Sequence, residues 1–197
     1  MTDDSSSEGL CPGGTCIGGR CNLPAWDRVM GSSDFGGFDV VWDVIMDERG
    51  RVYAGGSFSG EASFGGAGAP EVATGFAAAF IAAYERDGAY RWFRSVGGPG
   101  VDLVYRLAHA PGTDRLYAFV RVGLDGPADL GGGLRDPGAY VVAFDLTGSY
   151  QWDRELPFIE AIEATSEGGV LVAGMLSSGF DLGAGPARRH VRMRHIL

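Results

Sequence analysis

Three cysteines near the start of the chain are the residues whose type and spacing most directly suggest chemistry. Cys11, Cys16 and Cys21 are five residues apart within the glycine-rich stretch CPGGTCIGGRC. Three thiols at this spacing, without a fourth Cys or a His close by, do not match the ligand spacing of zinc sites. We therefore predict a small disulfide knot with one thiol left over, and no metal site.

Two aspartates at matching places in an internal repeat are the second candidate. Asp39 and Asp102 each stand directly before an alternating apolar run. A ring of such carboxylates could bind Ca²⁺ or a sugar, but a third copy of the repeat has Ile159 at this place. We favour the interpretation that each aspartate caps a turn by accepting hydrogen bonds from the backbone, with ion binding as the alternative.

The histidines and the glycine pairs do not form a catalytic pattern. His109 ends an alternating run, whereas His190 and His195 lie close to the C-terminal end. The sequence contains no G-x-S-x-G and no H-E-x-x-H motif, and its glycine pairs lack the strand-then-helix context of a phosphate loop. We predict no catalytic residue, no cofactor and no metal, and we expect that the protein is not an enzyme.

Evenly spaced aromatic residues indicate packing between repeated units. Trp26, Trp92 and Trp152 are 66 and 60 residues apart, and Tyr117 follows Tyr53 by 64 residues. The tryptophans could form a platform that stacks on sugars, but their similar spacing and their matching strand positions favour a structural role for all five residues. We expect Trp92 and Trp152 to be largely buried, so that Trp92→Ala costs ~3–5 kcal/mol of stability.

The aromatic residues recur because the chain repeats itself two and a half times. One copy begins at Asp39 with DVVWDVIMDERGRVYAGGSFSG, a second begins at Asp102 with DLVYRLAHAPGTDRLYAFVRVG, and a third opens with IEAIEATSEGGVLVAGMLSSG. A period of this size is typical of stacked supersecondary units, none of which buries its apolar face alone.

Each full copy contains four alternating runs that predict β-strands. Turn sequences such as DERG, ERDG and DLTG separate them and supply the backbone that tight hairpins need. AAAFIAAYERD has helical propensity, but its counterpart AYVVAFDLTG does not, so we predict strands for both. The eight predicted strands are 39–46, 51–58, 77–84, 89–96, 102–109, 115–122, 139–145 and 149–156.

Four antiparallel strands without an intervening helix are the content of a β-propeller blade. The stretch VVWDVIMDERGRVYAGGSFSG, with its D-x-x-G turn and V-Y-x-x-G strand, resembles the bacterial seven-bladed β-propeller repeat. The segments GEASFGG, AAAFIAAYERDGAYRW and FRSVGG are similar to the rest of that repeat in large secreted or surface proteins of myxobacteria-like organisms. The resemblance implies a propeller fold outside the cytoplasm and carries over no catalytic residue.

The predicted fold class is an all-β, incomplete propeller of about two full blades with partial blades at each end. We divide the chain into a polar leader at 1–22, which we expect to be disordered, repeats at 23–185 and a basic tail at 186–197. Within the repeats, blades are predicted at 38–96 and 101–156, with a partial blade at 158–185. The tail, PARRHVRMRHIL, abandons the strand pattern, as a shifted reading frame would.

Net charge and hydropathy argue against some classes of binding partner. Net charge is −9, and without the four arginines of the last ten residues 12 basic groups face 25 acidic ones. Such a surface disfavours nucleic acid and anionic lipid, and no apolar run is long enough to span a membrane. No signal peptide is visible, although the acidic, cysteine-containing leader is typical of the mature part of a secreted protein or lipoprotein.

We therefore expect a non-catalytic, extracytoplasmic propeller-repeat protein that acts as an interaction or structural scaffold. Its expected partners are a protein or a surface glycan, together with further copies that pair with open blade edges. One alternative is a truncated or frame-shifted gene fragment without independent function. The other is a propeller-based lyase or glycosidase, which would need His, Arg and carboxylates together where Asp39, Asp102 and Ile159 stand.

Overall fold

The computed structural model describes residues 15–17, 20–22, 26–32, 37, 39–157, 159–175 and 194–196. Throughout these residues the protein is all-β, with antiparallel sheets of two to four strands and no helix. Consequently, no helix that could cross a membrane occurs among them. The all-β prediction is confirmed.

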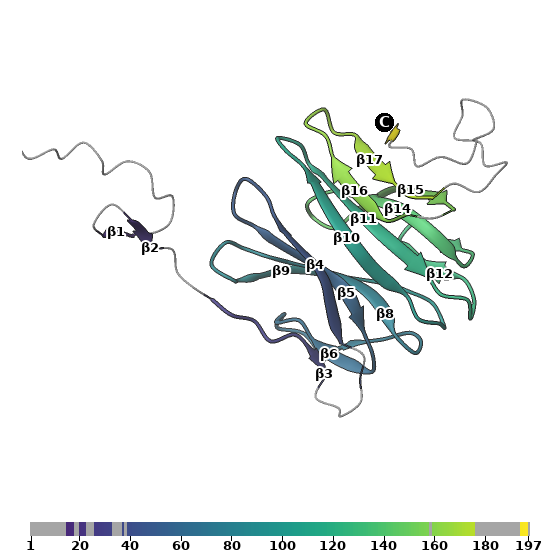
Figure 1. The fold of residues 1–197 in the computed structure, drawn as a ribbon. Coiled ribbons are helices and arrows are strands. Elements are labelled where there is room, and N and C mark those ends of the chain that lie inside the picture. Colours follow the sequence, from purple (N-terminus) through teal and green to yellow (C-terminus); the bar gives the residue numbers. More distant parts are fainter. Residues whose placement is uncertain are drawn as a thin grey trace, which may run out of the picture.

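Two four-stranded sheets form the centre of the fold, and each follows the chain in simple up-and-down order (Figure 1). Their strands agree to within one residue with the eight predicted from the sequence. The first sheet contains β4 (Val40–Met46), β5 (Val52–Phe58), β8 (Ala78–Tyr84) and β9 (Tyr90–Val96), and the second contains β10 (Leu103–Ala110), β11 (Arg115–Val122), β14 (Gly138–Phe144) and β15 (Tyr150–Leu156).

Strand β8 is the segment whose composition also suits a helix. It lies between β5 and β9 in the first sheet, and every one of its residues is buried. Ala79, Ile81 and Ala83 pack on one side of the sheet, and Phe80 and Tyr84 on the other. Successive side chains of a strand point to opposite faces of the sheet, so a strand lets both faces of this segment pack against a core. The stability gained from this packing outweighs the helical propensity of the residues.

The sheets pack against each other in the order of the sequence. One apolar core fills the space between the first and second sheets, and another lies between the second sheet and a third. The third sheet contains β16 (Ala161–Ala164), β17 (Val170–Ala173) and β18 (Arg194–Ile196). Figure 1 shows the two large sheets side by side, with β16 and β17 next to the second.

Strand β18 lies within the predicted basic tail. Arg194–Ile196 pairs antiparallel with Val170–Val172 of β17. It therefore stands third in its sheet, where β8 and β14 stand in the other two. The physical reason is that a strand edge offers backbone hydrogen bonds to any extended segment, whatever its side chains.

Two small sheets were not predicted, and each contains a hairpin from the connection between the second and third strands of a large sheet. Next to the first sheet lie β3 (Gly31–Ser32), β6 (Glu61–Ser63) and β7 (Glu71–Val72), and next to the second lie β12 (Ala128–Asp129) and β13 (Leu134–Arg135). Each delivers an apolar side chain to a core: Phe64 packs beside Phe58 and Phe80, and Leu130 beside Val122. Both small sheets thus close an end of a core.

Two short segments of the leader pair as strands. β1 (Thr15–Ile17) and β2 (Arg20–Asn22) pair antiparallel, with Cys16 opposite Cys21 in the register. Two glycines separate the strands in the sequence, and Gly-Gly favours a tight hairpin. The third member of the predicted disulfide knot, Cys11, lies outside the described residues, so the pairing of the thiols stays a prediction.

Candidate functional site

Trp92 and Arg94 on β9 bind the first sheet to the second. The Trp92 indole Nε1 donates a hydrogen bond to the Leu146 carbonyl at 2.9 Å, and Arg94 Nε donates to the Gly148 carbonyl at 2.7 Å. Both acceptors lie in the turn between β14 and β15. Gly148 has φ +82°, and a Cβ there would lie 2.9 Å from the Trp92 ring, so only glycine fits beneath the indole.

Trp26 and Arg28 make the same contacts one repeat earlier. Trp26 Nε1 donates to the Arg86 carbonyl at 2.9 Å, and the Arg28 guanidinium donates to the Gly88 carbonyl. The Trp26 ring lies on Gly88, where φ is +83°. Residues 26–30 form no strand, yet they contact the first sheet as β9 contacts the second. We call the two sets of contacts the Trp-Arg clasps.

Trp152 is the third tryptophan of the series and stands on β15. Its ring packs 5.8 Å from that of Tyr117, as the Trp92 ring packs 6.1 Å from that of Tyr53. Among the described residues its indole N–H has no hydrogen-bond partner. Trp92 and Trp152 are each partly buried against a core, in keeping with the expectation that they pack between units.

Asp39 and Asp102 accept hydrogen bonds from equivalent groups. Asp39 accepts from the Ser32 N–H and hydroxyl, both at 2.7 Å, and from the Ser59 N–H at 3.1 Å. Asp102, which is buried, accepts from the Gly98 N–H at 2.7 Å and the Gly123 N–H at 2.9 Å. Both carboxylates join the loop before the sheet to the end of its second strand, as the capping interpretation requires.

The hydrogen bonds of Asp39 are reflected in its acidity. Partial burial by itself raises the pKa of Asp39, but the bonds from Ser32 and Ser59 outweigh burial and hold the pKa below its ordinary value. Asp39 is therefore a carboxylate whose lone pairs are already used by the protein. Across the described residues, no three His, Cys, Asp or Glu side chains gather as a metal-binding group.

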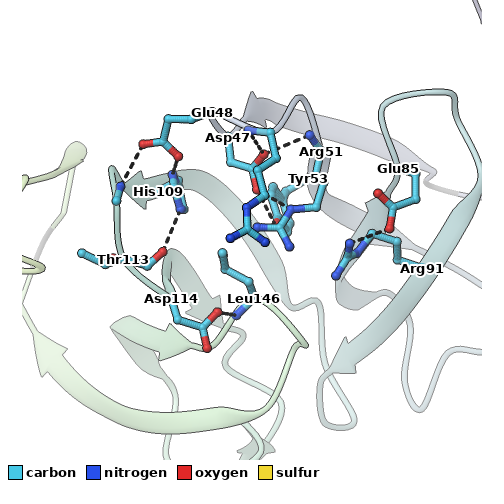
Figure 2. A network of polar contacts seen from close by, with 12 residues as sticks. Asp47, Glu48, Arg51, Tyr53, Glu85, Arg91, His109, Thr113, Asp114 and Leu146 are labelled. Carbon is cyan, nitrogen blue, oxygen red and sulfur yellow. Dashed lines mark hydrogen bonds and ion pairs between the residues drawn. The ribbon is translucent and has the colours of Figure 1, made fainter. Parts of the chain in front are cut away.

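A polar network occupies the turn end of the sheets, where Figure 2 shows it from close by. Glu48 accepts from the Gly112 N–H at 3.0 Å and lies 3.6 Å from the His109 ring, joining the first turn of one sheet to that of the next. The Leu146 N–H donates to Asp114 at 3.3 Å. These contacts hold turns together, and none of their donors and acceptors lines a described pocket.

The largest departure between the repeats is a pocket between the second and third sheets. Its volume is about 450 Å³, and its walls come from β10, β11, the start of β14 and the segment before β16. The equivalent position between the first and second sheets is filled. There Val104 and Leu107 pack directly on Gly55, and a Cβ on Gly55 would lie 2.6 Å from a Val104 methyl group. The second repeat has Phe119 in place of Gly55 and Arg121 in place of Ser57. These larger side chains stand where the first repeat allows close approach.

A bulge in β10 aims two more side chains into this pocket. The pairing of β10 with β11 shifts register between Val104 and Arg106, and both Tyr105 and Arg106 line the pocket. An extra residue in a strand turns its neighbours toward the same face. β4 carries the same irregularity between Val41 and Asp43.

Asp43 and Arg106 occupy this bulge in the two repeats with different results. Asp43 accepts a hydrogen bond from the Leu107 N–H of the next sheet at 2.8 Å. Arg106 is a donor only and cannot make that link. Its guanidinium instead donates to the carbonyl of the adjacent Tyr105 at 2.7 Å. The interface between the second and third sheets therefore lacks the hydrogen bond that Asp43 makes between the first and second sheets.

Comparison with known proteins adds no assignment to this geometry. No protein-family model and no curated protein matches the chain. Chemically, the pocket offers guanidinium donors and aromatic surface, whereas a nucleophile activated by a base is not among the residues that line it. Sequence reasoning missed Arg106 and Arg121, and the only available signal was their replacement of Asp43 and Ser57 in the aligned repeats.

Proposed function

We propose that this chain is a non-catalytic scaffold of β-propeller type, built from blades that dock through the Trp-Arg clasps. The observation that carries the proposal is that both clasps use the same residue types at the same repeat positions. Each ties the last segment of one unit, β9 in the second clasp, to the last turn of the next, a contact that can propagate from unit to unit. A repeated docking contact is what a scaffold needs to hold several surfaces in fixed relation.

The other parts of the proposal rest on the sequence. The four-stranded sheets, each in up-and-down order, support the resemblance to the bacterial seven-bladed β-propeller repeat family. The acidic leader with its three cysteines supports a place outside the cytoplasm, where disulfides persist. A scaffold of this kind would bind a protein or a surface glycan.

Removal of the second clasp tests the docking. Trp92→Ala deletes both a ring and a hydrogen bond to the next sheet, so we expect it to lower the free energy of unfolding by about 3 kcal/mol. Trp152→Ala is the matched control, because its ring is also half-buried against a tyrosine but lacks the described hydrogen bond. Denaturant unfolding followed by circular dichroism measures both.

The outcome separates a clasp from ordinary packing. A larger loss for Trp92→Ala than for Trp152→Ala, with faster amide exchange in both flanking sheets, supports docked blades. Equal losses confined to each tryptophan's own sheet would contradict the proposal. Measurable turnover of glycosidic substrates by the wild-type chain would contradict its non-catalytic part.

A further inference from the structure

The pocket between the second and third sheets contains two arginines without carboxylate partners. Among the described residues, Arg51, Arg91 and Arg135 form ion pairs with Asp47, Glu85 and Asp153. Arg106 and Arg121 form none, and both are exposed where they line the pocket. In a chain of net charge −9, a pair of unpaired guanidiniums creates a local positive potential that attracts an anion.

The geometry of β10 and β11 places the side chains of Arg106 and Arg121 on the face of the second sheet that lines the pocket. Along β11, Tyr117 and Phe119 face the third sheet, and Arg121 continues this alternation. On β10, Ala108 and Ala110 face the same way, so that Arg106 after the bulge does too. The planar fork of a guanidinium matches the two oxygens of a carboxylate better than it matches a spherical anion.

The rest of the pocket is aromatic and apolar. The rings of Tyr105 and Phe119 lie 5.4 Å apart, and Val122 and Ile159 add aliphatic surface. Glu160 is the single carboxylate among the lining residues. A volume of about 450 Å³ suits a small molecule or the end of a chain of sugars. Such walls favour a ligand whose body is a ring and whose charge is at one edge.

We infer that this pocket binds a carboxylate carried on a six-membered ring, with Arg106 and Arg121 pairing with the carboxylate and Tyr105 and Phe119 contacting the ring. Two sources share this chemistry, namely the uronic acids of acidic glycans and aromatic carboxylates. The pocket is separate from both Trp-Arg clasps, so loss of docking and loss of ligand binding are distinguishable.

Isothermal titration of the full chain with matched pairs of probes tests the inference. Digalacturonate is compared with its neutral counterpart digalactose, and benzoate with benzamide. We expect a charged probe to bind, its neutral partner to bind about tenfold more weakly or not at all, and the affinity to fall as salt is added. Binding of digalacturonate but not benzoate identifies a glycan, and the reverse identifies an aromatic acid.

Substitution of the pocket arginines tests whether the charged probe binds in this pocket. Arg121→Ala and Arg106→Ala are each expected to weaken the charged probe about tenfold or more, whereas Arg49→Ala, an exposed arginine of the β4–β5 turn, should leave it unchanged. Unfolding midpoints equal to wild type confirm that the variants fold, and the salt dependence of the wild type needs no variant. Equal affinity for charged and neutral probes, no binding of either acid, or affinities untouched by both substitutions would overturn the inference.

Discussion

At the scale of single residues, Asp47 does more for this fold than the two aspartates that the repeat first suggests. Its side chain is almost wholly buried and accepts from the backbone N–H groups of Arg49 and Arg51, from Arg51 Nε and from the Tyr53 hydroxyl. Burial raises the pKa of Asp47, but the bonds from Arg51 and Arg49 and the charge of Arg51 hold it below the ordinary value of 3.8. Burial and the charge of Asp47 in turn raise the pKa of Tyr53.

Asp47→Asn should reduce the loss of unfolding free energy that the protein shows as the pH falls. Because the folded-state pKa is lowered, the carboxylate stabilises the protein fully above its unfolded value, and this contribution disappears as pH falls below 3.8 toward the folded pKa. We expect the variant to be about 1–3 kcal/mol less stable at neutral pH and to approach the wild type in acid. Urea unfolding between about pH 7 and pH 3 measures this.

The control for this prediction is Asp125→Asn, which changes an exposed aspartate. Its unfolding curve should follow the wild type throughout the pH series. If Asp47→Asn loses stability in acid as steeply as the wild type does, the carboxylate of Asp47 is not the group responsible.

At the scale of elements, the second strand of each repeat decides how closely sheets pack. β5 reads VYAGGSF and β11 reads LYAFVRV at the matching positions. In β5, a Cβ on Gly56 would lie 1.9 Å from the Val40 carbonyl oxygen of the paired strand. Backbone cannot retreat as a flexible side chain can, so this glycine is required by the pairing of β4 with β5.

Gly56→Ala should therefore destabilise the protein by at least about 1–3 kcal/mol, the usual cost of overpacking. Gly68→Ala is the matched control, because a Cβ there meets nothing within 4 Å and φ is not in the left-handed region. We expect it to be neutral or slightly stabilising. Thermal unfolding of the pair checks this, and equal midpoints would show that β4 can move away from β5 at little cost.

At the scale of the whole molecule, the described sheets pack in series and leave one flank open. β4 is an edge strand that pairs only with β5 among the described strands. It presents four exposed apolar side chains, with Val44 at 56% and Met46 at 68% exposure beside Val41 and Trp42. An exposed apolar edge strand favours association with another chain. This arrangement supports the prediction that the protein self-associates.

Val44→Glu should weaken that association. A carboxylate on the edge strand opposes pairing through its charge and its hydration, and the chain is already acidic. Val29→Glu is the control, because Val29 is 90% exposed and belongs to no strand. Light scattering across a concentration series should show larger particles for wild type and Val29→Glu than for Val44→Glu. A wild-type monomer at every concentration would contradict the prediction.

The alternating runs and turn residues of the sequence determined the strands of the two large sheets. Period-2 alternation and positive-φ glycines such as Gly50 and Gly88 act within a few residues, so they are readable without a structure. The small sheets escaped prediction because strands of two or three residues have no periodicity to detect. β18 escaped because its pairing depends on the edge of β17 rather than on its own sequence.

Only the tertiary structure decided what the repeated residues contact. The spacing of Trp26 and Trp92 predicted packing between units, but their acceptors are backbone carbonyls, which have no signature in the sequence. The pocket likewise needs Arg106 and Arg121, which a bulge and the pairing of two strands bring to one face. The alternation of residues in a strand is local, so the sequence shows it directly. The contacts between two sheets depend on side chains that are distant in sequence and meet only after folding.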